Sequence, residues 1–169
     1  IIALRLVSSS SCSGKIRSPL IKSLLCTFQP CLKCTNIVNQ YLASVGLPPG
    51  LFWCAAFVYW CFDKAAVKNG RANPLVKTGH VMTHWNKTKG KKILTAEAVD
   101  KPSLIKPGHI FMMNTGGSSG HTGIIEKVYG GFVHTIEGNS NNAGSRNGIG
   151  VFRLQRKIAK INRGFIEYK

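Results

Sequence analysis

The stretch LFWCAAFVYWCF, Leu51–Phe62, is the most apolar run in the chain and decides the fold. It follows the turn sequence LPPG, whose two prolines and glycine cannot continue a helix. A new helix is therefore predicted to begin at Phe52 or Trp53 and to run to about Lys68. Because its first two turns are apolar almost all round, this helix should lie buried at the centre of the domain.

The two cysteines in this stretch occupy different positions in the predicted helix. Cys54 falls in the first turn of the predicted helix, where the helix dipole and unpaired N–H groups favour a thiolate and lower a thiol pKa of about 8.5. Cys61 lies seven residues further on and returns to nearly the same face, but two turns away from the helix end. We therefore interpret Cys61 as a packing residue. Cys54 is a candidate nucleophile, with a buried core cysteine as the alternative.

The flanking sequence predicts an α+β fold. Apolar residues at helical spacing indicate one helix over residues 35–46 and a third, shorter one from His80 to about Lys89. After Pro107-Gly108 the pattern changes to short strands separated by Gly and Asn turns. Five such segments occur, at residues 109–113, 122–129, 132–138, 149–156 and 164–168. Helices followed by an antiparallel meander are typical of α+β proteins and not of alternating βαβ folds.

His121 and Glu137 occupy opposite ends of one predicted hairpin. His121 begins a strand after the polar segment NTGGSSG, and Glu137 ends the next strand, with Asn139 two residues later. Pairing about the Gly130-Gly131 turn sets residue 121 opposite roughly residue 140, so these ends should meet. A carboxylate or amide bonded to one imidazole nitrogen leaves the other nitrogen free to serve a thiol. The alternative is a solvated hairpin with an incidental histidine and glutamate.

The motifs WCAAFVYW, GHTGII and TIEGN, in this order, resemble the CHAP amidohydrolase/peptidase family. The resemblance extends from about Asn36 to Tyr168. It implies a papain-like fold in which N-terminal helices pack on a five- to six-stranded antiparallel sheet. It also implies a hydrolase of the phage lysin and bacterial autolysin type, which cleaves amide bonds in peptidoglycan. The expected activity is that of an N-acetylmuramoyl-L-alanine amidase or a peptide endopeptidase.

The same resemblance implies a role for each candidate residue. It implies Cys54 as the nucleophile, His121 as the base, Glu137 as the group that orients the histidine and Asn139 as a further polar partner. His109 stands where members of the family usually carry aspartate, at a position that supports the structure and is not itself catalytic.

The charge of the chain is strongly positive, since 23 Lys and Arg face 6 Asp and Glu for a formal net charge of +17. Such a surface attracts polyanions, among them nucleic acid, anionic lipid and the anionic polymers of bacterial envelopes. We expect peptidoglycan and anionic envelope polymers as partners, no specific nucleic acid, no transmembrane segment and a monomer. An alternative function is a catalytically inactive papain-like module that binds polyanions.

The chain is predicted to divide into an atypical leader, residues 1–34, and a catalytic domain, residues 35–169. The leader is free of acidic residues and rich in Ser and Cys, which suggests a truncated signal or a disordered segment. Its Cys31-Leu-Lys-Cys34 motif has no second pair at zinc-ligand spacing. His80 and His84 lie on one helix face without a clear third ligand, so no metal or cofactor is predicted. The expected location is extracellular, periplasmic or the cell envelope, or the cytoplasm until lysis for a phage-encoded enzyme.

Overall fold

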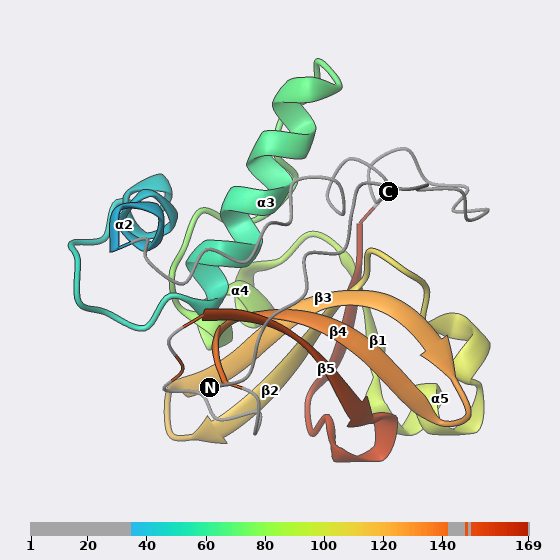
Figure 1. Ribbon diagram of the computed structural model, residues 1–169. Coiled ribbons are helices and arrows are strands. Elements are labelled where there is room, and N and C mark those ends of the chain that lie inside the picture. The colour runs from blue at the N-terminus through green and yellow to red at the C-terminus, as the bar shows by residue number, and fades with distance from the viewer. Residues whose placement is uncertain (1–34, 142–147, 149, 169) are drawn as a thin grey trace, which may run out of the picture.

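Helices precede most strands in the computed structural model, which describes residues 35–141, 148 and 150–168 (Figure 1). The elements in chain order are α2 (Thr35–Ser44), α3 (Cys54–Lys68), α4 (Val81–Lys87), β1 (Lys91–Leu94), α5 (Thr95–Asp100), the 3-10 turn η1 (Pro102–Leu104), β2 (Ile110–Gly116), β3 (Ser119–Tyr129), β4 (Phe132–Ser140), β5 (Gly150–Lys157), the 3-10 turn η2 (Ile158–Lys160) and β6 (Gly164–Glu167). The predicted α+β class is confirmed. The predicted leader lies outside the described residues.

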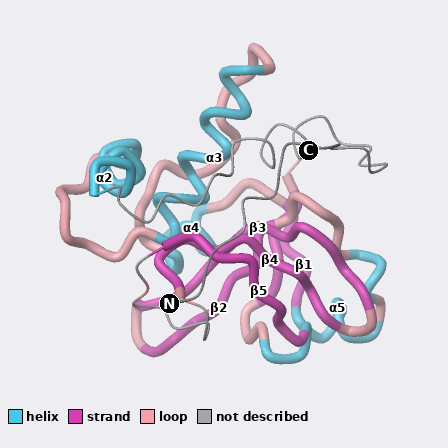
Figure 2. Tube along the Cα trace, in the orientation of Figure 1, coloured by secondary structure: helices cyan, strands magenta, loops and turns pink. Residues whose placement is uncertain are grey.

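The sheet has six strands in the order β1-β6-β2-β3-β4-β5, and all neighbouring pairs are antiparallel (Figure 2). Strands β2 to β5 form the predicted meander. The last strand, β6, returns to lie between β1 and β2. The five strand segments identified in the sequence are therefore present, and β1 is the sixth strand of the predicted five to six.

The central helix α3 begins within two residues of its predicted start and ends at the predicted Lys68. Gly50 in the preceding turn has φ of 88°, a left-handed conformation that suits glycine. At the other end, the Asn69 side chain donates to the Ala65 carbonyl at 2.6 Å, and Gly70 takes φ of 61°. The Asn69 side chain thus satisfies a backbone carbonyl at the end of the helix, and Gly70 allows the chain to turn away from the helix axis. The N-terminal end of α3 is directed at the sheet and its C-terminal end projects away (Figure 1).

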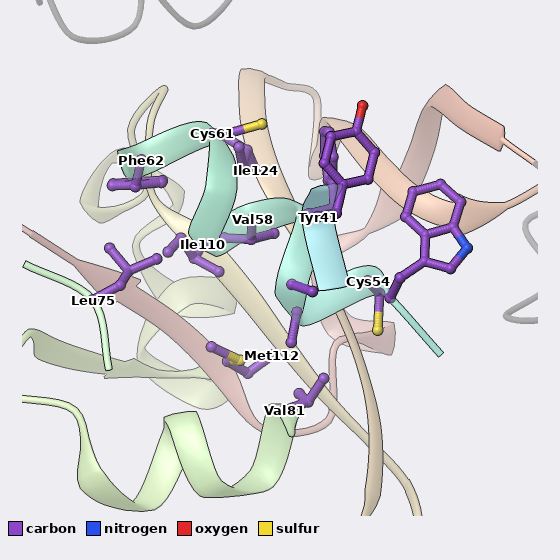
Figure 3. Close-up of a cluster of buried hydrophobic side chains, with 14 of the residues drawn as sticks. Tyr41, Cys54, Val58, Cys61, Phe62, Leu75, Val81, Ile110, Met112 and Ile124 are labelled. Atoms are coloured by element: carbon purple, nitrogen blue, oxygen red, sulfur yellow. The ribbon is translucent and has the colours of Figure 1, made fainter. Parts of the chain in front are cut away.

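Alternate residues of the sheet face two separate cores. Ile110 and Met112 of β2 face the helices and pack in the cluster drawn in Figure 3, together with Cys54 and Cys61 of α3. Phe111, between them, faces the opposite side in a second cluster with residues of β3, β4 and β6 and of the α5 and η2 segments. The period of two along the strands thus builds a layer on each face. No helix within the described part of the chain has the length and apolar character to cross a membrane.

His84 of α4 belongs to this structural framework. Its side chain is buried, and its Nε2 lies 2.6 Å from the hydroxyl of Tyr168, which also bonds Thr88 Oγ1 at 2.6 Å. Burial lowers the pKa of His84 to about 4. The neighbouring His80 of the sequence pair is exposed. His84 therefore acts as a neutral core residue, joined to the C-terminal end of the chain.

We expect the protein to lose stability as the pH falls from about 6.5 towards 4. The pKa of His84 is lower in the folded state than the ordinary value of about 6.5, so protonation favours the unfolded chain. Between pH 7.5 and pH 5 this linkage removes about 2 kcal/mol from the free energy of unfolding. Urea unfolding at the two pH values measures the loss, and His84→Gln should reduce the difference by about the 2 kcal/mol that His84 contributes. An equal difference in the wild type and the variant, with exposed His80→Gln as the control, would contradict this assignment.

Candidate active site

Cys54 is the first residue of α3 and is buried. The backbone N–H groups of Ala55, Thr122 and Cys54 itself act on the thiol in the direction that lowers its pKa. The N–H groups of Cys54 and Ala55 belong to the first turn of α3, where backbone N–H groups have no partner within the helix. That of Thr122 belongs to β3. The side chain is thus fixed between the start of α3 and the sheet.

Burial raises the pKa of the Cys54 thiol to about 11, although the three N–H groups act in the opposite direction. The lowered pKa expected from the helix end alone is therefore wrong for this structure. Burying the thiolate away from water destabilises it by more than the nearby backbone N–H groups stabilise it. The resting thiol is neutral, and it needs a base in order to react at neutral pH.

Cys61 lies in the same apolar cluster at a different level of α3 (Figure 3). It is as buried as Cys54, and burial raises its pKa with no opposing hydrogen bond among the described groups. This environment is that of a packing cysteine.

The end of the β3–β4 hairpin opens to admit the start of α3. The last residue pair between the two strands is Ile124 with Ile136, so the N–H of Thr122 is available to the Cys54 sulfur. Beyond this point Gly138 lies directly against α3, because a Cβ there would come within 2.7 Å of Phe57 and of Trp53. The glycine permits this close approach.

His121 and Glu137 form a buried pair at the same end of the hairpin. His121 Nε2 lies 2.7 Å from Glu137 Oε2, and both side chains are inaccessible to solvent or nearly so. His121 Nδ1 has no hydrogen-bond partner within the described residues. Thr122, whose backbone N–H acts to lower the pKa of Cys54, is the residue next to His121. The charge of Glu137 also acts on the Cys54 thiol and raises its pKa, so the His121–Glu137 pair lies within electrostatic range of Cys54.

Asn139 is buried two residues beyond Glu137 and has φ of 57°, a left-handed conformation uncommon outside glycine. Its backbone carbonyl accepts a hydrogen bond from the N–H of Gly148 at 3.3 Å. Its assignment as a further polar partner of His121 stays a prediction.

Arg156 of β5 is a member of the site that the sequence did not identify. Its Nε donates to Glu137 Oε1 at 2.6 Å and its Nη2 to Oε2 at 2.5 Å, while the hydroxyl of Thr135 donates to Oε1 at 2.5 Å. Its guanidinium also lies over the ring of Phe111, 5.5 Å from the centroid. The alternation of side chains along β5 could have indicated this position. Arg153 and Lys157 face outward, so Arg156 on the same strand faces the opposite side.

Several donors keep the Glu137 carboxylate charged. Burial alone would raise the pKa of Glu137, but hydrogen bonds from Arg156 and His121, the charge of Arg156 and the hydrogen bond from Thr135 outweigh it and hold the pKa below its usual value. At neutral pH Glu137 therefore accepts hydrogen bonds and donates none. The Nε2 of His121 must then carry the proton of that hydrogen bond.

Gly123 makes the room that the pair needs. A Cβ at this position would lie 2.8 Å from Glu137 Cγ and 2.7 Å from the carbonyl of Ile136. We expect Gly123→Ala to lower the free energy of unfolding by about 1–3 kcal/mol, because backbone cannot move aside cheaply. Chemical denaturation measures the change. In the control Gly150→Ala the closest neighbour is only the ring of Phe152 at 3.0 Å, so a Gly123→Ala variant as stable as this control would contradict the packing.

His109 precedes β2 and is buried. Its Nδ1 accepts the N–H of Lys106 at 3.4 Å, and burial lowers its pKa. A neutral imidazole thus binds the backbone of the turn before the strand. An aspartate at this position could accept the same bond.

A hollow of about 450 Å³ lies elsewhere, between the β3–β4 turn and the segment around η1. Its walls include Lys127 and Tyr129 of β3. These residues follow His121 by six and eight positions, or roughly 20 Å and more along the strand. The hollow is therefore separate from the Cys54 site.

A helix that begins with a cysteine and packs on an antiparallel sheet bearing a buried His–Glu pair is the arrangement of papain-like cysteine hydrolases. The model of the CHAP domain family matches residues 46–139, more than half of the chain. The chain therefore belongs to the CHAP domain family, whose members are in general cysteine- and histidine-dependent amidohydrolases and peptidases. Neither a curated protein nor a solved structure gives a match.

Proposed function

We propose that this protein hydrolyses an amide bond of peptidoglycan, as an N-acetylmuramoyl-L-alanine amidase or a peptide endopeptidase, with Cys54 as the nucleophile. The observation that supports the proposal is a buried His121–Glu137 pair whose carboxylate acts by its charge on Cys54, the first residue of α3. Membership of the CHAP domain family supports the reaction class.

In the proposed mechanism His121 acts as a general base. Because Nε2–H of His121 donates a hydrogen bond to the Glu137 carboxylate, the Nδ1 lone pair is free to take the thiol proton as the sulfur attacks the amide carbonyl. The backbone N–H of Cys54, at the start of α3, would stabilise the oxyanion of the tetrahedral intermediate. The imidazolium then gives its proton to the leaving amine, and water hydrolyses the thioester with His121 again as base.

Product analysis tests this reaction class. Incubating purified peptidoglycan with the protein should release new free amino groups and no new reducing sugar ends. Mass spectrometry of the fragments then identifies the amide bond that is cut, whether between glycan and peptide or within the peptide. New reducing ends without new amino groups would refute the proposal.

A distal basic surface supports the proposed attraction to anionic envelope polymers. On the end of the hairpin away from Cys54, Lys127 lies over the ring of Tyr129 and Lys157 over that of Phe132, and Tyr129 is 74 % exposed. Helix α3 does not extend over this end of the sheet (Figure 1). The surface would retain the enzyme on the bacterial envelope, which we propose as its place of action.

The alternative, an inactive polyanion-binding module, makes a different prediction. Such a module would bind wall fragments with a steep dependence on salt and release no amino groups. Release of amino groups that depends on Cys54 would exclude it.

A further inference from the structure

We infer that Arg156 is a positioning residue for the proposed reaction, which keeps Glu137 as an obligate hydrogen-bond acceptor and thereby selects the His121 tautomer with Nδ1 unprotonated. The inference rests on the proposed function of Cys54 and His121. It goes beyond that function because it adds a fourth group, on a different strand, that decides which nitrogen of the base carries the proton.

The contacts of Arg156 are those of a fixed group. Its two nitrogens bind both oxygens of Glu137, an arrangement that defines the plane of the carboxylate as well as its charge. Its side chain is 18 % exposed, whereas that of Glu137 is fully buried. The ring of Phe111 lies under the guanidinium and also 5.9 Å from the ring of His121. Arg156 and His121 are therefore held against the same aromatic residue.

The protonation state of Glu137 controls the histidine tautomer. An ionised Glu137 can only accept, so the nitrogen that faces it, Nε2, must be protonated, and Nδ1 keeps its lone pair. A protonated Glu137 could donate to Nε2 and stabilise the opposite tautomer, in which Nδ1 carries a proton and cannot act as a base. A buried carboxylate without its cation favours the protonated form. Removing Arg156 should therefore misplace the proton on His121.

Three titratable or charged groups face Glu137 from the elements packed against it: Cys54 of α3, His121 of β3 and Arg156 of β5. Within β4 itself, Thr135 adds a neutral hydroxyl donor, and the neighbouring residue of β2 is the uncharged Phe111. The neutral thiol of Cys54 cannot replace the charge of Arg156. Arg156 is thus the fixed cation that counters Glu137 across the range in which the enzyme would work.

Arg156→Gln tests the inference in two independent ways. The acid limb of the pH profile for amino-group release should move up by about 1–3 pH units, since an adjacent arginine lowers the pKa of a carboxyl group by that amount. The rate at pH 7 should fall about 10- to 100-fold. Long-range ¹H–¹⁵N NMR of His121 should show the Nε2–H tautomer in the wild type and an increasing share of the Nδ1–H tautomer in the variant as the pH is lowered.

Arg153→Gln is the matched control. It removes the same charge from the same strand, but Arg153 binds Glu126 on the surface at 3.0 Å. It should leave the pH profile and the tautomer of His121 unchanged. Arg156→Lys, which keeps the charge but donates from one nitrogen, should lie between the wild type and Arg156→Gln.

The outcomes separate this inference from the proposed function. Arg156→Gln with the wild-type acid limb and tautomer would overturn the inference while leaving the hydrolase intact. If Arg156→Gln does not fold, the tautomer of His121 in the wild-type protein still tests the inference. An Nδ1–H tautomer at pH 7 in the wild type would overturn it. A wild type with the expected tautomer but no release of amino groups would instead refute the proposed function.

Discussion

Replacing Cys54 with alanine should lower the release of amino groups from purified peptidoglycan by at least about 10³-fold, because no other group in the site can form the thioester. Cys54 is the first residue of α3, and the charge of Glu137, in the buried His121–Glu137 pair, acts on its thiol. Amine labelling of the soluble fragments measures the rate. The fold should survive, since alanine replaces one small side chain in the first turn of α3.

Cys61→Ala is the matched control for this change. It removes the same side chain from the same helix and the same apolar cluster, but no hydrogen bond or charge of the described site residues affects the pKa of Cys61. Its rate should stay within a few-fold of the wild type, as judged on protein with a normal circular dichroism spectrum. Equal losses in the two variants, with folding intact, would exclude Cys54 as the nucleophile.

Glu137→Ala should produce the largest loss of stability. The change leaves the guanidinium of Arg156 facing a buried site without its partner, and breaking a buried ion pair in this way costs about 3–5 kcal/mol. It also removes the acceptor that orients His121, so hydrolysis should be lost together with stability. Urea unfolding at pH 7.5 measures the free-energy change.

Glu137→Gln removes the negative charge of the side chain but keeps nearly its shape. The amide has nearly the same volume and one oxygen that can still accept from His121 or Arg156, so its loss of stability should be clearly smaller than that of Glu137→Ala. Its amide group also presents N–H donors where the carboxylate had oxygens, so the rate should still fall. An alanine variant within about 1 kcal/mol of the wild type would contradict the network of buried hydrogen bonds described here.

The sequence alone predicted the main helices and strands and their order along the chain. The Pro-Pro-Gly turn and the apolar run predicted where α3 begins, because helix breakers and hydrophobic period are local signals. The β3–β4 hairpin was predicted from its Gly-Gly turn. β1 was not found, since only Ile93 of its four residues is buried and one inward residue gives no alternation.

The detailed geometry depends on features that the sequence does not reveal. Counting from the turn places His121 opposite roughly residue 140, but the pairing shifts between Ile125 and Lys127, so the register beyond that point changes by one residue. Such an irregularity is set by the packing of the whole sheet. The bond from Arg156 to Glu137 joins two strands whose relative register is equally a tertiary property.

The pKa of Cys54 shows the same limit. The helix end alone predicts a lowered value, whereas the folded site raises it to about 11 because the thiol is buried. Cys54 is buried because the start of α3 packs against the end of the β3–β4 hairpin, an arrangement that no local sequence pattern encodes. The correction changes the expected mechanism from a preformed thiolate to a proton transfer that requires His121.

The dependence of Cys54 on His121 can be measured directly by iodoacetamide alkylation as a function of pH, with peptide mapping to separate Cys54 from Cys61. In the wild type, Cys54 should react at neutral pH, because His121 can accept the thiol proton. In His121→Ala this neutral reactivity should disappear and return only as the pH approaches the thiol pKa of about 11. Identical profiles for Cys54 in the two proteins would contradict the account.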